Sequence, residues 1–133
     1  NPTVVNSGNH VSAVIVSISG VREDVIPYTQ FNSSSEAISA NHTIPGLHAS
    51  QGNSLIILST TWSTNNAGPL VTFSPNPDLT AMTEIFDAGH VDGNGGGIAI
   101  ATAIRALIGT IGVTNTTFSV AGVAGQFAVA FVG

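Results

Sequence analysis

The chain has 133 residues with seven acidic and two basic side chains, a formal net charge of −5 at pH 7 and no Cys. That length suits one domain, and the lack of Cys excludes disulfides, thiolate metal sites and cysteine nucleophiles. Two arginines, Arg22 and Arg105, cannot form the basic patch that nucleic acid or an anionic membrane surface requires.

Residues 1–10 (NPTVVNSGNH) are expected to form an extended arm, and residues 11–133 a single β-sandwich domain. The chain begins with Asn1 instead of Met, which is expected of a processed or trimmed product. Within the arm, Val4 and Val5 are expected to add to the sheet edge of a neighbouring subunit, or to lie along a capsid or filament surface.

The first half of the domain alternates apolar with Ser, Thr and Asn residues. Residues 11–19 (VSAVIVSIS) are apolar on both faces and are predicted to form a central strand covered on both sides. A shorter edge strand over 25–31 contains Pro27, and a loop follows at 32–35. A further strand is predicted over 37–44, with Ile38 and Ile44 facing the core.

The second half continues the pattern from residues 54–61 (SLIILSTT), the second strong strand. In residues 97–107 a period of two favours a strand over a helix, and the apolar stretch 97–113 is too short and too broken by Arg105 to span a membrane. Eight or nine short strands indicate an all-β, antiparallel β-sandwich of the jelly-roll or immunoglobulin-like kind. The remaining predicted strands are 69–73, 82–87, 116–120 and 126–132.

A Gly-rich run after residues 82–87 holds the densest group of potential ligands. Asp87, Asp92 and Asn94 offer oxygens in part of the pattern of a calcium loop, but the later bidentate Glu of an EF-hand is missing. A zinc site built on His90 lacks a second His nearby. The favoured interpretation is a hairpin connection in which Gly, Asn and Asp tolerate positive φ, and calcium is the alternative.

No catalytic residues and no cofactor are expected. Glu84 and Asp87 stand three apart in a predicted strand, so they should point to opposite faces and cannot act as paired carboxylates. The histidines occur singly and are expected at surface or loop positions; they are His10, His42, His48 and His90.

Trp62 has two interpretations. Beside Asn65 and Asn66 it could present an aromatic face to a glycan, but a Trp at the end of a strand more often caps the core, and the core is favoured. The acceptor pattern for N-glycosylation occurs at Asn32, Asn41 and Asn115, although chance matches are expected in a chain so rich in Ser, Thr and Asn.

Four segments carry a family resemblance: SISGV at 17–21, GNSLII at 52–57, GGGIAIAT at 95–102 and QFAVAF at 126–131. Together they resemble a small β-sandwich domain of bacteriophage virion proteins, found in tail fibres and in head fibres or decorations. The first strand of such domains often opens with an aromatic residue, where this chain has Val11. The resemblance implies structural motifs and no catalytic residues.

The expected function is therefore a non-enzymatic structural protein on the surface of a virus particle. The resemblance implies a symmetric homo-oligomer, with a trimer favoured, that docks on other virion proteins. The alternatives are a lectin-like or adhesin module that recognises host glycans near Trp62, and a subunit of an extracellular filament that uses the arm as a donor strand.

Overall fold

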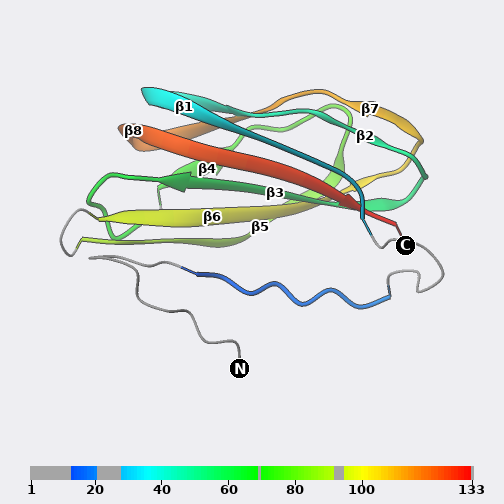
Figure 1. The fold of residues 1–133 in the computed structure, drawn as a ribbon, viewed down its shortest axis with the longest axis horizontal. Coiled ribbons are helices and arrows are strands. Elements are labelled where there is room, and N and C mark those ends of the chain that lie inside the picture. Colours follow the sequence, from blue (N-terminus) through cyan, green and yellow to red (C-terminus); the bar gives the residue numbers. More distant parts are fainter. Residues whose placement is uncertain (1–12, 21–27, 69, 92–94, 133) are drawn as a thin grey trace.

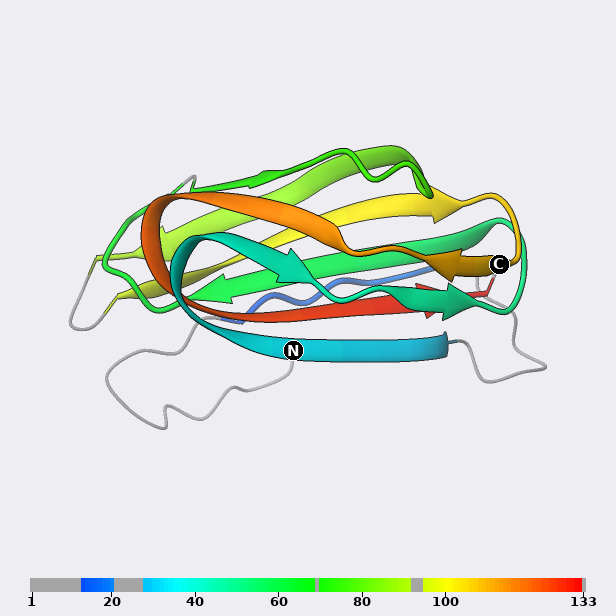
Figure 2. The same cartoon turned by 90° about the horizontal axis from the view of Figure 1, so that it is seen from above.

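The computed structural model describes residues 13–20, 28–68, 70–91 and 95–132. Within these ranges the regular structure is entirely β, with antiparallel strands packed in two layers (Figures 1 and 2). The predicted fold class is confirmed. The strands are β1 (Tyr28–Ile44), β2 (Leu47–Ala49), β3 (Ser54–Trp62), β4 (Val71–Phe73), β5 (Thr80–His90), β6 (Gly96–Arg105), β7 (Gly109–Ile111) and β8 (Thr114–Phe131).

One long two-stranded ribbon determines the architecture. β1 pairs with β8 from end to end, and β2 continues the ladder against β7, where Leu47 lies opposite Ile111. The register shifts between Glu36 and Ser39 and again between Ser39 and Asn41. Such bulges bend a strand and let it pass from one sheet layer to the other, so the ribbon folds over the core (Figure 2).

The ribbon divides the molecule into a large layer and a small layer. The large layer holds residues 28–36 of β1, residues 124–131 of β8, and then β3, β6 and β5 in that order. The small layer holds residues 41–44 of β1, residues 114–118 of β8, and β4, β2 and β7.

The core lies between these two layers. The large layer contributes mainly small side chains, including Ala101, Ala103 and Ala128, while the small layer contributes bulky ones such as Ile44 and Leu47. Because small residues face large ones, the layers can approach closely without leaving voids.

Several predicted strands are confirmed: residues 54–61 lie in β3, 82–87 in β5, 116–120 and 126–132 largely in β8, and 97–107 largely in β6 as a strand. The predicted loop at 32–35 is wrong, because β1 runs straight through it. The predicted strand at 11–19 is wrong for residues 13–19, which belong to neither sheet. The strands are also not all short, since β1 spans 17 residues and β8 spans 18.

Candidate functional site

The outer face of the large layer is the main candidate surface. Directly paired residues of antiparallel strands share a face, so the registers define its rows. The described residues in these rows include no Asp, Glu, Lys or Arg, and the last row ends the face with the exposed His90. The rows are Phe131–Leu55–Ile104–Thr80, Phe31–Val129–Ile57–Thr102–Thr83, Ser33–Phe127–Ser59–Ile100–Phe86, Ser35–Gly125–Thr61–Ile98–Ala88 and Gly96–His90.

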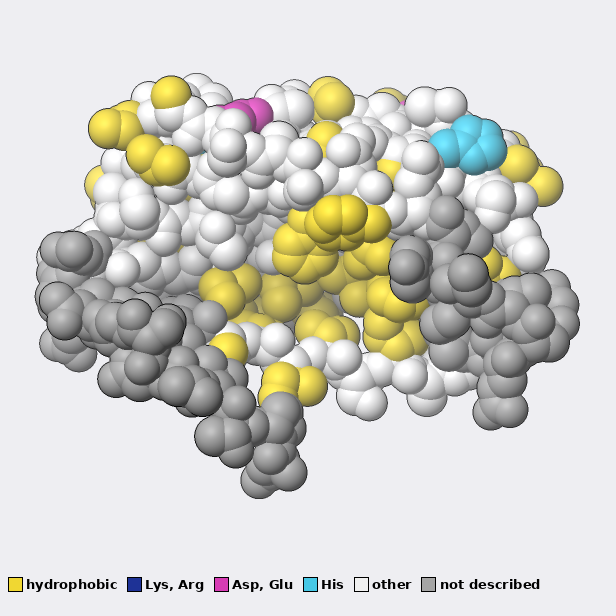
Figure 3. All heavy atoms as spheres, viewed as in Figure 1, with side chains coloured by type: hydrophobic (Ala, Val, Ile, Leu, Met, Phe, Trp, Pro, Cys, Tyr) yellow, Lys and Arg dark blue, Asp and Glu magenta, His cyan; other side chains and the backbone are white. Residues whose placement is uncertain are grey.

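Residues 13–20 lie along part of the outer face (Figures 1 and 2), and most of its described side chains on the edge strands β1 and β5 are open to solvent. Apolar side chains gather in the middle of the face in Figure 3. Ile57 and Ile100 are buried, whereas Phe31 is 57% exposed and Phe86 is 37% exposed. The exposed Phe31 ring stacks against Phe127, with centroids 6.0 Å apart. The edge strands thus leave aromatic surface open to a partner.

Both long edges of the large layer are protected against pairing with another strand. On the β1 side, Asn32 Nδ2 donates to the Gly46 carbonyl at 2.7 Å, and Gln30 Oε1 accepts from the His48 amide, which ties β1 to the β2 region. On the β5 side, register shifts between Thr80 and Thr83 and after Glu84 interrupt the edge. Such features hinder strand addition, so the face and not the edge is the surface suited to association.

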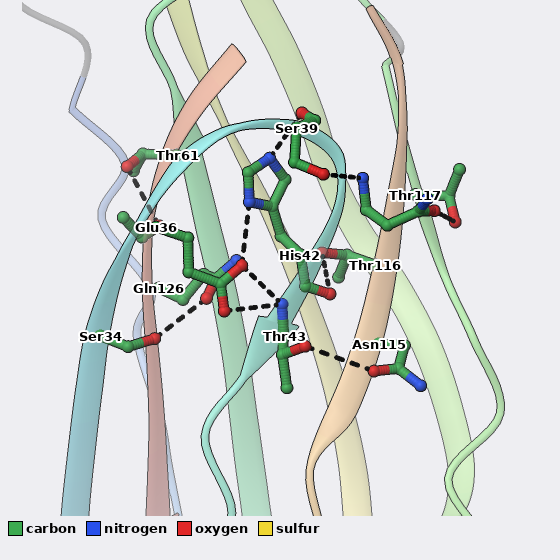
Figure 4. Close-up of polar contacts among 12 residues, drawn as sticks. Ser34, Glu36, Ser39, His42, Thr43, Thr61, Asn115, Thr116, Thr117 and Gln126 are labelled. Carbon is green, nitrogen blue, oxygen red and sulfur yellow. Dashed lines mark hydrogen bonds and ion pairs between the residues drawn. The ribbon is translucent and has the colours of Figure 1, made fainter. Parts of the chain in front are cut away.

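A buried polar contact occupies the corner where the ribbon bends (Figure 4). The His42 ring is 1% exposed and packs on Phe118 with ring centroids 4.6 Å apart. Its Nε2 lies 2.8 Å from the Ser39 carbonyl and its Nδ1 lies 3.0 Å from Glu36 Oε2. The Glu36 carboxyl also accepts from the Thr43 amide at 3.2 Å, so it fastens both sides of the bulge.

The hydrogen bonds of His42 specify how many protons the contact holds. The Ser39 carbonyl can only accept, so Nε2 carries a hydrogen. The contact between Nδ1 and Glu36 then requires one more proton, on the imidazole or on the carboxyl. The contact between Glu36 and His42 joins the two sides of the bulge and so stabilises the bend of β1. The expected surface position is therefore wrong for His42, although His48 and His90 are exposed.

Trp62 is buried in the core, the favoured interpretation, and so does not present the exposed aromatic face that the glycan alternative requires. Its side chain is 4% exposed and contacts the edge of the Phe118 ring, with centroids 5.9 Å apart. Gly97 lies opposite Trp62 in the ladder and Gly89 lies opposite Gly97. A Cβ at Gly97 would overlap the indole, and one at Gly89 would lie 2.9 Å from it. These glycines are thus required by packing.

The two asparagines that accompany Trp62 have local structural roles. Asn66 Oδ1 accepts from the Gly68 amide at 3.1 Å, which is an Asx turn. Asn65 is exposed and lies against Gly95, whose φ is +64°; a Cβ there would overlap the Asn65 side chain. The described residues 63–68 of this loop include no other aromatic side chain.

Of the three calcium candidates, the structure describes only Asp87. Asp87 Oδ2 accepts from the Leu70 and Val71 amides at 2.8 and 2.7 Å, so this carboxylate fixes the start of β4. Asp92 and Asn94 lie outside the described residues, as do Val4 and Val5 of the arm. Across the ranges that can be described, no three His, Asp or Glu side chains are grouped to hold a metal ion.

The expectation that Glu84 and Asp87 point to opposite faces is wrong. Ile85 is an extra residue in β5, so Glu84 pairs with Ala101 and Asp87 with Ala99, two residues of the same inner face. Partial burial and, secondarily, the negative charge of Asp87 raise the pKa of Glu84 above its ordinary value. Asp87 already accepts hydrogen bonds from the Leu70 and Val71 amides, so its carboxylate joins β5 to the start of β4.

Two of the three glycosylation patterns face each other on the small layer. Asn41 pairs with Thr117, and Thr43 pairs with Asn115. The Thr117 hydroxyl donates to Asn41 Oδ1 at 3.2 Å and the Thr43 hydroxyl to Asn115 Oδ1 at 3.5 Å (Figure 4). All three acceptor asparagines, Asn32 included, are exposed. The outer side of the small layer is therefore a polar surface, unlike that of the large layer.

A hollow of about 320 Å³ lies beside these residues where β4 meets β8. Its lining alternates hydroxyl and apolar side chains and holds no titratable group; the residues are Leu70, Val71, Thr72, Thr117, Phe118 and Ser119. No sequence pattern points to this hollow, because it depends on the pairing of two segments that are distant in the chain.

Comparison with known proteins found no match among family models, curated proteins or solved structures. In the part of the chain that the structure describes, no helix has the length and apolar character to cross a membrane.

Proposed function

We propose that this chain is a non-enzymatic structural protein of a virus particle, a capsid decoration or fibre domain that assembles with copies of itself. One observation carries the proposal: the outer face of the large layer holds no Asp, Glu, Lys or Arg in its described rows and leaves Phe31 57% exposed. Exposed apolar surface of this kind marks an interaction site in a soluble protein. The resemblance to phage virion domains adds the particle context.

The face suits a like partner because a copy of the same chain offers the same uncharged surface. Two molecules of net charge −5 repel each other at a distance, so they associate most readily through the parts that bear no charge. The protected edges favour contact through this face over a donor-strand filament. The buried Trp62 removes the main reason to prefer a lectin.

Replacing Phe31 by Ser tests the self-association. Phe31→Ser removes exposed aromatic area from the outer face, so we expect its mass by light scattering to fall toward that of one chain, while the wild type is oligomeric. Ile38→Ser is the matched control, because Ile38 is 74% exposed on the same strand but lies at the bend of the ribbon. A monomeric wild type, or equal loss in both variants, would contradict the proposal.

The particle context has a separate test. In a density gradient of particles from cells that make this chain, we expect the protein to sediment with nuclease-resistant nucleic acid. A chain found only at the top of the gradient would exclude a virion role, even if it were oligomeric.

A further inference from the structure

Residues 13–19 (AVIVSIS) have the sequence of a strand but no place in either sheet. They follow the outer face of the large layer over much of its length (Figures 1 and 2). A β-branched, alternating segment has a high preference for a ladder, because its side chains pack well on a pleated surface. The segment therefore lies on the candidate surface without forming a ladder with either sheet.

In an extended chain, Val14, Val16 and Ile18 share one side of this segment, and Ile15 lies on the other side with Ala13, Ser17 and Ser19. Val14 and Ile18 are half-buried and Val16 is 37% exposed, whereas Ile15 is 70% exposed. An apolar side chain such as Ile15 gains about 1.5–3 kcal/mol from full burial. A second apolar surface placed against the segment would supply that burial.

The chain's own sheets do not offer the missing ladder among their described edges. The β1 edge is tied to the β2 region by the Asn32 and Gln30 side chains, and the β5 edge is interrupted by bulges. A strand of another molecule would supply the ladder that these described edges do not. The nearest suitable sequence is the same segment, which is free of charge and so can lie against its own copy without repulsion.

We propose that residues 13–19 pair in an antiparallel ladder with residues 13–19 of a second copy, between the outer faces of two large layers. This inference rests on the self-association proposed above and names its contact. A two-fold axis through the segment makes the contact self-complementary, so that Ile15 of each copy is covered by the other molecule. The unit of assembly is then a dimer, or a multiple of dimers, and not the trimer that the resemblance implies.

Single cysteines test the pairing directly, because the natural chain has none. Each residue from 13 to 19 is replaced by Cys in turn, and disulfide formation between chains is measured under mild oxidation. Residues opposite each other across a two-fold axis have Cα atoms about 4.5–5.5 Å apart, which a disulfide can span. We expect cross-linked dimer to peak at one or two neighbouring positions and to be nearly absent at both ends of the segment.

Thr110→Cys is the control, because Thr110 is an exposed residue of β7 in the small layer. It should give little dimer under the same conditions. If light scattering shows oligomers but no position from 13 to 19 cross-links above the Thr110→Cys level, or all do so equally, the strand pairing is wrong while self-association stands. If the wild type is monomeric, the proposed function fails and this contact fails with it.

Discussion

Glu36 provides a sharp test at the scale of single residues. Glu36→Ala leaves the buried Nδ1 of His42 and the Thr43 amide without their hydrogen-bond partner. Removing one partner of a buried polar contact leaves the other desolvated and unpaired, so we expect a loss of about 2–4 kcal/mol in the free energy of unfolding. Urea denaturation at neutral pH measures this loss.

Glu36→Gln is the matched control for that substitution. A Gln amide can donate to Nδ1 of a neutral His42 and its carbonyl can accept from Thr43, so every buried group keeps a partner. We expect it to retain most of the stability. Equal losses in Glu36→Ala and Glu36→Gln would show that the hydrogen bonds of Figure 4 do not hold the bend.

The alternation of side chains along residues 37–44 is a sequence signal for the burial of His42. His42 has the same parity as Ile44, the predicted inward residue of residues 37–44, and both are buried. Ile38 has that parity too but is 74% exposed, because the register shifts beyond Glu36 intervene. Alternation therefore predicts burial only as far as the next bulge, and a bulge depends on a partner strand distant in sequence.

At the scale of elements, the packing of β3 on β5 and β6 depends on glycine at position 97. Gly97→Ala would force a methyl group into the Trp62 indole and the Ala88 carbonyl. Overpacking a close-fitted site costs about 1–3 kcal/mol. Because Trp62 is the only Trp, its fluorescence reports both the unfolding midpoint and any displacement of the ring.

Gly125→Ala serves as the comparison for Gly97→Ala. Its Cβ would meet only the Thr61 hydroxyl, at 3.0 Å on the outer face, so a small shift of that side chain relieves the contact. We expect a loss well below that of Gly97→Ala and no change in the Trp62 emission. If Gly97→Ala is as stable as the wild type, the indole does not lie over the glycine pair.

The strands that the sequence predicted well are those whose own residues provide the signal. β3 and β6 have apolar side chains on both faces, and they lie in the middle of the large layer. Residues 32–35 and 121–125 gave no such signal, yet both are strand, because each is held by the ladder between β1 and β8. Residues 13–19 are the reverse case, since a strong strand pattern has no ladder within the chain.

At the scale of the whole molecule, the acidic side chains that the structure describes are separated from the candidate surface. Of the acidic residues in the described ranges, Glu84 and Asp87 lie in inner-face rows, Glu36 at the bend, and Asp78 accepts from Arg105 and from the Gly112 amide. Residues 54–61 and 126–132 carry apolar side chains on both sides, which is typical of strands covered on both faces. The sequence does not show which segment or partner molecule lies against the outer face of these strands.

This separation predicts how salt affects assembly. Raising NaCl from about 0.01 M to about 1 M shortens the Debye length from about 30 Å to about 3 Å and screens the repulsion between chains of net charge −5. Because the contact surface itself is uncharged, nothing attractive is screened, and the dissociation constant should fall. Sedimentation equilibrium across the salt series measures it, with Ile38→Ser expected to follow the wild type. Weaker association at high salt would mean that charge pairs hold the copies together, and that the outer face of the large layer is not the contact.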